Sequence, residues 1–281
     1  MSRSKAAPRT VIIGGTAGIG LATARRLAAE GHAVTVVGRT PGRIDEAVAS
    51  ITAKDGGSVQ GRRADLTDRA SLDALFAELG EFEHLVVTAP GDGAPGTLVD
   101  LDLAALHSAF NSKLIAYAHT IQAAVPHLDG QDGSITLVSA ASTQAALPGT
   151  AGLAAVNGAV EALVPTLALE LAPIRVNAVS PGVVDTGWWD RVVPADQRPG
   201  LMAEFAKGIP AGRVGQPDEI ADAIALLVRN GFLTGTVLPI DGGARLKPPA
   251  GLSRQSAISP LRLARAPRPG GSRPPGAASR R

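Results

Sequence analysis

A glycine-rich stretch, Gly14–Gly20, with the sequence GGTAGIG, follows an apolar run and precedes a segment rich in Ala and Leu. A strand, a glycine-rich turn and a helix N-terminus in succession let the backbone approach a pyrophosphate closely. The N–H groups and the dipole of the helix then face its negative charge. Glycine-rich turns also occur in ordinary tight connections. Because this turn directly follows the first predicted strand, the sequence favours a nucleotide-binding site.

The glycines are spaced G-x-x-x-G-x-G, and further features accompany them along the chain. These are Asp65-Leu66, Asn111, a strand end that contains Ser, Pro181-Gly182 and the late Asp241-Gly242-Gly243. In this combination the chain resembles the short-chain dehydrogenase/reductase family over residues 9–244. The resemblance implies a Rossmann-type α/β fold, a nicotinamide cofactor, a small-molecule substrate and assembly as a homodimer or homotetramer.

The resemblance also implies which residues contact the cofactor. They are Gly14, Thr16, Ala17, Gly18, Ile19, Gly20, Asp65, Leu66, Thr88, Ala89, Asn157, Pro181, Gly182, Val184 and Thr186. Each has an alternative structural reading, since glycines suit tight turns and Leu66 suits a core. Thr88 to Gly91, with the sequence TAPG, stand where the family has NNAG.

The end of the second predicted strand indicates which nicotinamide cofactor is bound. Gly38 stands where members that prefer NAD usually carry an acidic residue, and Arg39 follows it. A carboxylate would repel a 2′-phosphate, whereas a guanidinium binds it through charge-assisted hydrogen bonds. The sequence therefore favours NADP(H). The alternative is that Arg39 is only a solvated loop residue.

The catalytic residues of the family are missing. In the family a Ser closes the fifth strand, and Tyr-x-x-x-Lys follows near the start of the next helix, with Tyr as the general acid/base. Here the matching positions hold Ala140, Leu153 and Asn157. Leu153 cannot exchange protons, and Asn157 supplies no charge. Loss of general acid–base help typically costs about 10²–10⁴ in rate.

A shift in the alignment does not restore the missing groups. The chain's only tyrosine is Tyr117, and no lysine lies between Lys113 and Lys207. Lys113 is a candidate for a substitute cation. It is two residues beyond Asn111, so on a regular helix it points away from that residue and is expected to be exposed unless a local kink brings it inward.

The polar residues that remain near the fifth strand are Asn111, Ser139, Ser142, Thr143 and Gln144. Asn111 matches the family's Asn, which holds a water in the proton relay. Ser139 needs a one-residue bulge to face the site, whereas Ser142 is better directed if the strand continues. Asn111, Ser139 and Ser142 are therefore the catalytic candidates.

Three functions remain open. The first is a divergent NADPH-dependent reductase whose substrate, such as an activated alkene, an iminium ion or a quinoid ring, needs no protein acid. The second is a nucleotide-binding protein without turnover, such as a sensor, a scaffold or an inactive subunit. The third is a cyclase or dehydratase that uses the same pocket.

Seven strand-like runs must position these residues, and most are separated by helix-length amphipathic segments. The runs are Arg9–Gly15, Ala33–Arg39, Ser58–Leu66, His84–Pro90, Ser134–Ala140, Ile174–Gly182 and Gly235–Gly243. This alternation predicts a doubly wound parallel sheet in a single domain. Between 185 and 212 the alternation lapses into a segment that contains Trp188 and Trp189, which we expect to be an irregular lid over the substrate.

Composition sets the class of protein. Hydrophobic residues make up 45% of the 281 residues, and there is no cysteine, so the chain has no disulfide or cysteine metal site. The five histidines do not cluster, and no metal is expected. The start lacks the apolar core of a signal peptide, and no run approaches 18 apolar residues, which predicts a cytoplasmic protein without membrane contact.

The charge is distributed unevenly. Residues 245–281 hold nine of the 27 basic residues and none of the 25 acidic ones, so residues 1–244 carry a net charge of −7. The segment 245–281 is rich in Pro, Gly and Arg and is expected to be a disordered tail, and residues 1–8 are expected to be flexible. The tail is either a solvated extension or an arm for anionic partners, and the acidic body argues against nucleic acid as the main partner.

Overall fold

The computed structural model describes residues 7–55, 58–191 and 193–246. It contains a sheet of seven strands in the order β3-β2-β1-β4-β5-β6-β7. All neighbouring strands are parallel. The strands are β1 (Arg9–Ile13), β2 (Ala33–Gly38), β3 (Val59–Arg63), β4 (His84–Val87), β5 (Ser134–Val138), β6 (Arg175–Pro181) and β7 (Val237–Ile240). The predicted Rossmann-type sheet is therefore confirmed.

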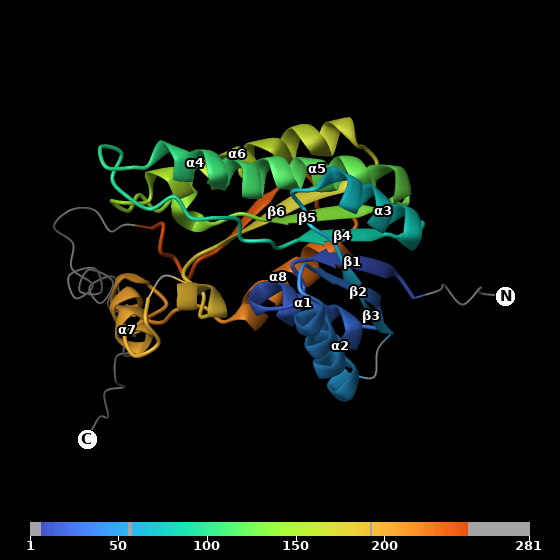
Figure 1. The fold of residues 1–281 in the computed structure, drawn as a ribbon, viewed down its shortest axis with the longest axis horizontal. Helices are drawn as coiled ribbons and strands as arrows, with labels where there is room; N and C mark the ends of the chain where they lie inside the picture. Colours follow the sequence, from blue (N-terminus) through green and yellow to red (C-terminus); the bar gives the residue numbers. More distant parts are fainter. Residues whose placement is uncertain (1–6, 56–57, 192, 247–281) are drawn as a thin grey trace, which may run out of the picture. The chain divides into compact units, whose positions relative to one another are not determined.

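Eight α-helices in the described residues connect and cover these strands. They are α1 (Gly18–Ala29), α2 (Pro41–Asp55), α3 (Arg69–Leu79), α4 (Leu103–Ala109), α5 (Ala116–Ala124), α6 (Ala151–Glu170), α7 (Arg198–Gly208) and α8 (Pro217–Arg229). One core cluster joins α3, α5 and α6 to one face of the sheet, and a second joins α1, α2 and α8 to the other. Figure 1 shows these two helical layers with the sheet between them.

Some helices begin where the sequence offers hydrogen bonds to their first N–H groups. The side chain of Asp68 accepts a hydrogen bond from the Ala70 N–H at the start of α3, and Asp102 does the same for Ala104 at the start of α4. Helix α8 begins with a capping box between Gln216 and Glu219. Helices α5, α6 and α7 begin without a side-chain cap, and so does α1, because Ala17 at its N-cap has no side chain that could accept such a bond.

A π-helical turn, η1 (Phe110–Ile115), interrupts the path from α4 to α5. The wider turn changes which side chains face the sheet, and it makes Lys113 one of the buried residues. The sequence predicts an exposed Lys113 on a regular helix, and that prediction is wrong. π-helical turns are rare and are frequent at functional sites.

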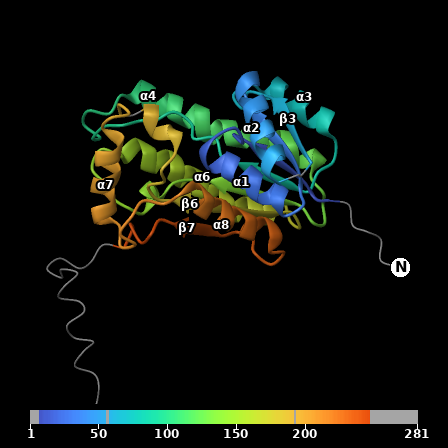
Figure 2. The same cartoon turned by 90° about the horizontal axis from the view of Figure 1, so that it is seen from below.

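The segment between β6 and α8 is more regular than the sequence suggests. It contains a 3₁₀ turn, η4 (Gly187–Arg191), and helix α7. The expected irregular segment is therefore partly helical. Helix α7 lies beyond the C-terminal ends of the parallel strands, on the side away from the start of β1 (Figure 2).

Helix α6 is the described helix that is long and apolar enough to cross a membrane by length and composition, with a mean hydropathy of 1.5 over 18 residues. The expectation that no segment approaches this limit is therefore too strict. Val156, Val160 and Val164 of α6 are buried, and the helix packs on the sheet next to β6. The helix also contains Pro165, which does not interrupt it.

The predicted flexible start and basic tail lie almost entirely outside the described residues. Of 245–281 the structure describes Arg245 and Leu246. The described chain up to Arg245 belongs to one compact unit, with all seven strands inside it.

Candidate active site

The glycine-rich turn meets the loop after β4 at the point where the strand order reverses. Strand β1 lies between β2 and β4, so the connections from β1 and β4 separate here and leave a crevice beyond the strand ends. A Cβ on Gly14 would lie 2.8 Å from Thr88 Oγ1, and a Cβ on Gly20 would lie 2.2 Å from the Gly14 carbonyl oxygen. Only glycine fits at these two positions, and the predicted residues Gly14, Gly20 and Thr88 are in direct proximity.

The N-terminus of α1 opens into this crevice without a side-chain cap. Ala17 is extended, with φ −158° and ψ 165°, and it makes no capping hydrogen bond. Gly18 has φ +51°, which favours glycine. The N–H groups of Gly18, Ile19 and Gly20 in the first turn have no side-chain oxygen to bind, and they are available to an anion. The residues present therefore fit the pyrophosphate of a dinucleotide.

The end of β2 excludes an acidic side chain and carries two cations nearby. A Cβ on Gly38 would lie 2.7 Å from Thr16 Cγ2, so no carboxylate can be placed there without displacing Thr16. Arg39 is exposed directly after Gly38. Arg63, also exposed, stands opposite Gly38 in the parallel pairing of β2 and β3. This arrangement fits a phosphate better than a free ribose hydroxyl.

Asp65 and Leu66 follow β3 as predicted, and the structure gives each a separate role. The N–H and the hydroxyl of Thr67 donate to Asp65 Oδ1 at 3.0 and 2.7 Å. These two bonds, with smaller attractions from Arg39 and Arg63, hold the pKa of Asp65 below its usual value. The side chain of Leu66 is buried in the core.

The three positions of the missing triad lie at the end of β5 and on the first turns of α6. Ala140 is extended after β5, with φ −159° and ψ 147°. Leu153 is half-buried on α6. Asn157 is fully buried, and its Nδ2 donates to the Leu153 carbonyl at 2.8 Å. Asn157 Oδ1 is buried without a hydrogen-bond partner, so it remains available to a donor such as a ribose hydroxyl.

Ser139 is engaged elsewhere. Its Oγ donates to Glu161 Oε1 at 2.7 Å and approaches the Val179 carbonyl at 3.2 Å. The same carboxylate oxygen also accepts hydrogen bonds from Thr143 and Ser180, at 3.1 and 2.7 Å. The structure thus gives this catalytic candidate a structural role. Glu161 joins β5, β6, α6 and the turn after β5, a role that the sequence analysis missed because these partners are distant in the chain.

Asn111 also departs from the expected position. Its side chain is exposed, and its Nδ2 lies 3.1 Å from Nδ1 of His107. Lys113 is buried in its place, with an exposed fraction of 5%. The π-helical turn is the physical reason, because it turns the side chain at 113 inward.

Ser142 lines a cavity between the turn after β5 and the first turn of α6. The cavity has a volume of about 540 Å³ and is lined by Thr97 and Leu98 on one side and by residues drawn from 142–154 on the other. None of the described lining residues is charged. Ser142 was expected to face the site if strand β5 continued, but β5 ends at Val138. The 3₁₀ turn Ala141–Thr143 nevertheless brings Ser142 to the wall of the cavity. Ser142 Oγ is buried without a partner.

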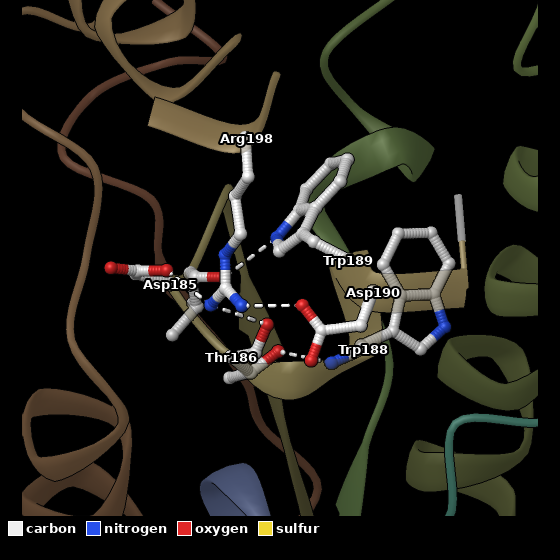
Figure 3. Close-up of polar contacts among 7 residues, drawn as sticks. Asp185, Thr186, Trp188, Trp189, Asp190 and Arg198 are labelled. Carbon is white, nitrogen blue, oxygen red and sulfur yellow. Dashed lines mark hydrogen bonds and ion pairs between the residues drawn. The ribbon is translucent and has the colours of Figure 1, made fainter. Parts of the chain in front are cut away.

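Hydrogen bonds fix the start of the lid, directly after β6, as Figure 3 shows. Arg198 at the start of α7 donates to Asp185 Oδ1 at 2.6 Å and to the Thr186 carbonyl at 2.8 Å. Its other nitrogen donates to Asp190 at 2.6 Å. The indole N–H of Trp189 donates to the Val184 carbonyl at 2.9 Å. The predicted carboxamide-binding residues Val184 and Thr186 are therefore held in place by hydrogen bonds from Trp189 and Arg198.

Thr186 and the two tryptophans are linked to one another within this segment. The Trp188 N–H donates to Thr186 Oγ1 at 3.3 Å, which leaves the hydroxyl proton of Thr186 for another acceptor. The rings of Trp188 and Trp189 pack edge to face, with centroids 4.9 Å apart. The two tryptophans thus form one apolar unit of the lid.

Pro181 and Gly182 link β6 to this segment as expected. A Cβ on Gly182 would lie 2.8 Å from the Asp241 Cα, so the close approach of β6 and the end of β7 requires glycine. Asp241 is buried and accepts hydrogen bonds from the Gly243 and Arg245 N–H groups at 2.9 and 3.0 Å. Among the described residues no group of three or more acidic or His side chains could hold a metal ion.

A sequence family and several known proteins resemble this chain. The sequence family described as enoyl-(acyl carrier protein) reductase matches residues 14–245. The chain is 32% identical over 256 residues to the short-chain dehydrogenase/reductase ATR9 of Stachybotrys chlorohalonatus, with 84% of this chain and 96% of that protein covered.

Two solved structures resemble the chain closely. A small-chain dehydrogenase in complex with NADPH has 32% identity and a TM-score of 0.72, and covers 86% of this chain and 100% of its own. A short-chain oxidoreductase of Pseudomonas aeruginosa PAO1, bound to NADPH and containing an atypical catalytic center, has 29% identity and a TM-score of 0.77, with 88% and 97% covered. Both hold the cofactor that the sequence favours. The chain belongs to the short-chain dehydrogenase/reductase family of oxidoreductases.

Proposed function

We propose that the protein is an NADP(H)-dependent oxidoreductase that reduces a small uncharged organic substrate by hydride transfer, without a tyrosine as general acid. The observation that carries the proposal is the contrast between the two halves of the site. The crevice at Gly14 and the uncapped N-terminus of α1 fit a dinucleotide, while Ala140 and Leu153 stand where the acid–base residues of the family belong.

Different residues of this chain bind different parts of the cofactor. The first turn of α1 binds the pyrophosphate, and Arg39 with Arg63 binds the 2′-phosphate. The Thr186 hydroxyl binds and orients the carboxamide, and Asn157 Oδ1 accepts a hydrogen bond from a ribose hydroxyl. The bound nicotinamide supplies the hydride. The NADPH complexes of the two solved relatives support this assignment.

The cavity defines the class of substrate. With no charged side chain among its described lining residues, it favours an uncharged molecule, because a carboxylate or phosphate would lose its hydration without gaining a partner. Ser142 Oγ is a buried hydroxyl at the wall without a partner, and it can donate to a carbonyl oxygen of the substrate. We expect Trp188 and Trp189 of the lid to cover the bound nicotinamide and to exclude water.

The experiment follows the absorbance of NADPH with a panel of uncharged ketones, enones, imines and quinones, each paired with a carboxylate analogue of similar size. We expect oxidation of NADPH with members of the uncharged set and much weaker activity with their acidic counterparts. Calorimetry with NADPH alone provides the control for binding. An acidic substrate preferred over its uncharged analogue would contradict the substrate class.

Restoring the family's catalytic residues tests the consequence of their loss. Ala140→Ser, Leu153→Tyr and Asn157→Lys together should raise the turnover of simple carbonyl substrates by about a hundredfold or more, the usual contribution of general acid catalysis. Single restorations should change little, because the Tyr acts as an acid only beside the Lys charge and the Ser hydroxyl. A triple variant that is folded and binds NADPH but gains no turnover would contradict this interpretation.

A second candidate function is nucleotide binding without turnover, as in a sensor or an inactive subunit. The observation that favours it is Leu153, which offers no proton to a substrate. Tight binding of NADPH together with no consumption across the panel would favour this candidate over the reductase.

A further inference from the structure

Lys113 is a buried cation, with an exposed fraction of 5%. Among the charged groups of the described residues, Glu161 is the one that acts on it. The Nζ lies 5.8 Å from the centroid of the Tyr117 ring, a contact that provides weak cation–π attraction. Burial lowers the pKa of Lys113 from its ordinary value of 10.5 to about 8, and the charge of Glu161 opposes this shift.

Glu161 is an incomplete counterion for Lys113. Its Oε1 accepts hydrogen bonds from the hydroxyls of Ser139, Thr143 and Ser180. The carboxylate is therefore held toward β5 and β6, and its attraction to Lys113 acts at a distance. A buried ammonium in this position costs stability, because it loses hydration and gains little in return. Such a group is a candidate for chemistry rather than for support.

The chain holds Lys113 beside the cofactor crevice. A Cβ on Gly91 would lie 2.8 Å from the Lys113 Cβ, so the loop after β4 packs directly on the stem of the lysine. Gly91 has φ +69°, and its conformation also favours glycine. The same loop contains Thr88, which contacts the glycine-rich turn. The π-helical turn and Gly91 together direct Lys113 under this loop.

The opposite wall presents a buried acceptor without a partner. The π-helical turn packs against α6, which carries Asn157. Asn157 Oδ1 has no hydrogen-bond donor, and Leu153, one turn earlier on α6, offers neither charge nor proton. The positive charge that the family carries on α6 is absent from that helix, and a buried positive charge is present on the element that faces it.

We propose that Lys113 is the proton donor of this site, and that it protonates an uncharged substrate whose C=O, C=N or C=C bond accepts the hydride of the cofactor. This inference rests on the proposed function. The hydride bonds to one atom of the double bond, and the other atom takes the proton from the ammonium as its N–H bond breaks. The neutral amine then regains a proton from water. The net reaction consumes one NADPH and one proton for each substrate reduced.

The inference differs from the sequence-derived expectation that the substrate needs no protein acid. It also differs from a structural role, in which Lys113 stabilises the fold as the counterion of Glu161. The two roles predict opposite effects of Lys113→Met, which keeps the length of the side chain and removes its charge. Thermal unfolding and NADPH consumption, measured on the same preparations, separate them.

For a proton donor, Lys113→Met should raise the unfolding temperature at pH 7, because the variant no longer buries an unpaired charge. The same variant should lower turnover by at least about a hundredfold while NADPH still binds. Lys207→Met, which removes an exposed charge from α7, is the control for stability and should leave the unfolding temperature nearly unchanged. A structural lysine would instead make Lys113→Met less stable.

The pH dependence of turnover distinguishes a proton donor from a structural lysine. The groups that face Lys113 are Glu161 from α6 and Tyr117 from α5, and burial raises the pKa of Tyr117 far above its usual value. Turnover of the unmodified protein should fall as the pH rises through about 8, when the ammonium loses its proton. Lys113→Arg retains the charge but does not release its proton in this range, so both Lys113→Arg and Lys113→Met should show a low rate without this fall.

Stability should change with pH in the opposite direction. The folded state releases the Lys113 proton at a lower pH than the unfolded state, so between about 8 and 10.5 the unfolded state binds more protons. The free energy of unfolding should therefore rise as the pH increases across this window, and this rise should be absent from Lys113→Met. If Lys113→Met keeps the rate and the pH profile of the unmodified protein, this inference is overturned, but the proposed function is not. Absence of any NADPH consumption by the unmodified protein overturns the proposed function and this inference with it.

Discussion

Arg39 and Arg63 lie at the ends of neighbouring strands, on either side of a glycine that leaves no room for an acid. Arg63 stands opposite Gly38 in the pairing of β2 and β3. The adjacent Arg62 is differently engaged, since its Nε donates to Glu78 at 2.7 Å. We therefore expect the two exposed guanidinium groups at 39 and 63 to bind a 2′-phosphate.

We expect NADP(H) to bind more tightly than NAD(H), and Arg39→Asp to invert the order, because the new carboxylate repels the phosphate and accepts ribose hydroxyls. Arg63→Gln should weaken NADP(H) by about tenfold, in line with the loss of one charge-assisted hydrogen bond. Calorimetry with both cofactors measures this. Arg62→Gln is the matched control and should retain the wild-type preference. Equal affinities for the two cofactors in the unmodified protein would count against the assignment.

Individual residues also show where sequence reasoning stops. The cofactor residues could be predicted because a glycine-rich turn needs only local conformation and its position after a strand. Asn111, Ser139 and Lys113 could not be placed, because their directions depend on a π-helical turn and on hydrogen bonds to Glu161, which is 22 residues from Ser139. The sequence contained one usable signal, a Glu on the same helix face as Asn157.

At the scale of elements, all seven strands were predicted, and all of them except the polar edge strand β3 follow from short runs rich in apolar residues. Helix α7 was not predicted, because its core-facing residues are few and Met202 is the buried residue that it contributes. Its position depends instead on Arg198, which binds residues of the preceding segment. Tertiary contacts of this kind leave no periodic pattern in the sequence.

The opposite end of the sheet contains a buried histidine pair that should make stability depend on pH. The rings of His32 and His84 have centroids 5.6 Å apart, and Thr10 Oγ1 lies 2.9 Å from Nδ1 of His32. Burial lowers the pKa of His32, against smaller opposite effects of Glu30 and Glu83 and with a small contribution from Arg229. The unfolded state therefore takes up a proton at a higher pH than the folded state.

The free energy of unfolding should consequently fall as the pH drops below about 6.5, with a slope of at most about 1.4 kcal/mol per pH unit for one proton. Urea unfolding between pH 5 and 8 measures this slope. His32→Gln should reduce it, whereas His107→Gln, on the exposed side of α4, should retain it. An unchanged slope in His32→Gln would show that another group controls the acid sensitivity.

At the scale of the whole molecule, the charges separate into an acidic body and a basic C-terminal segment. The body contains the sheet, the crevice and the cavity, and β7 and Asp241 precede residue 245. The assembly as a homodimer or homotetramer, the cytoplasmic location and the role of 245–281 remain predictions from the sequence.

Deletion of the residues from Pro248 onward should leave the unfolding temperature and the affinity for NADPH nearly unchanged, because every described strand and cofactor-contacting residue lies before it. Thermal unfolding, calorimetry and light scattering on the full-length and shortened proteins measure this. A loss of assembly or of cofactor affinity in the shortened protein would show that the segment contributes to the body.

The lid is held at both of its ends. Arg198 ties its first end to Asp185 and Thr186, and the Ala211 N–H donates to the Gly242 carbonyl at 3.0 Å at the other end. A segment fixed at two points cannot swing open about a single hinge, and it admits molecules only by arching between its attachments. Motion of the segment 185–212 is therefore confined to the stretch between these two attachments.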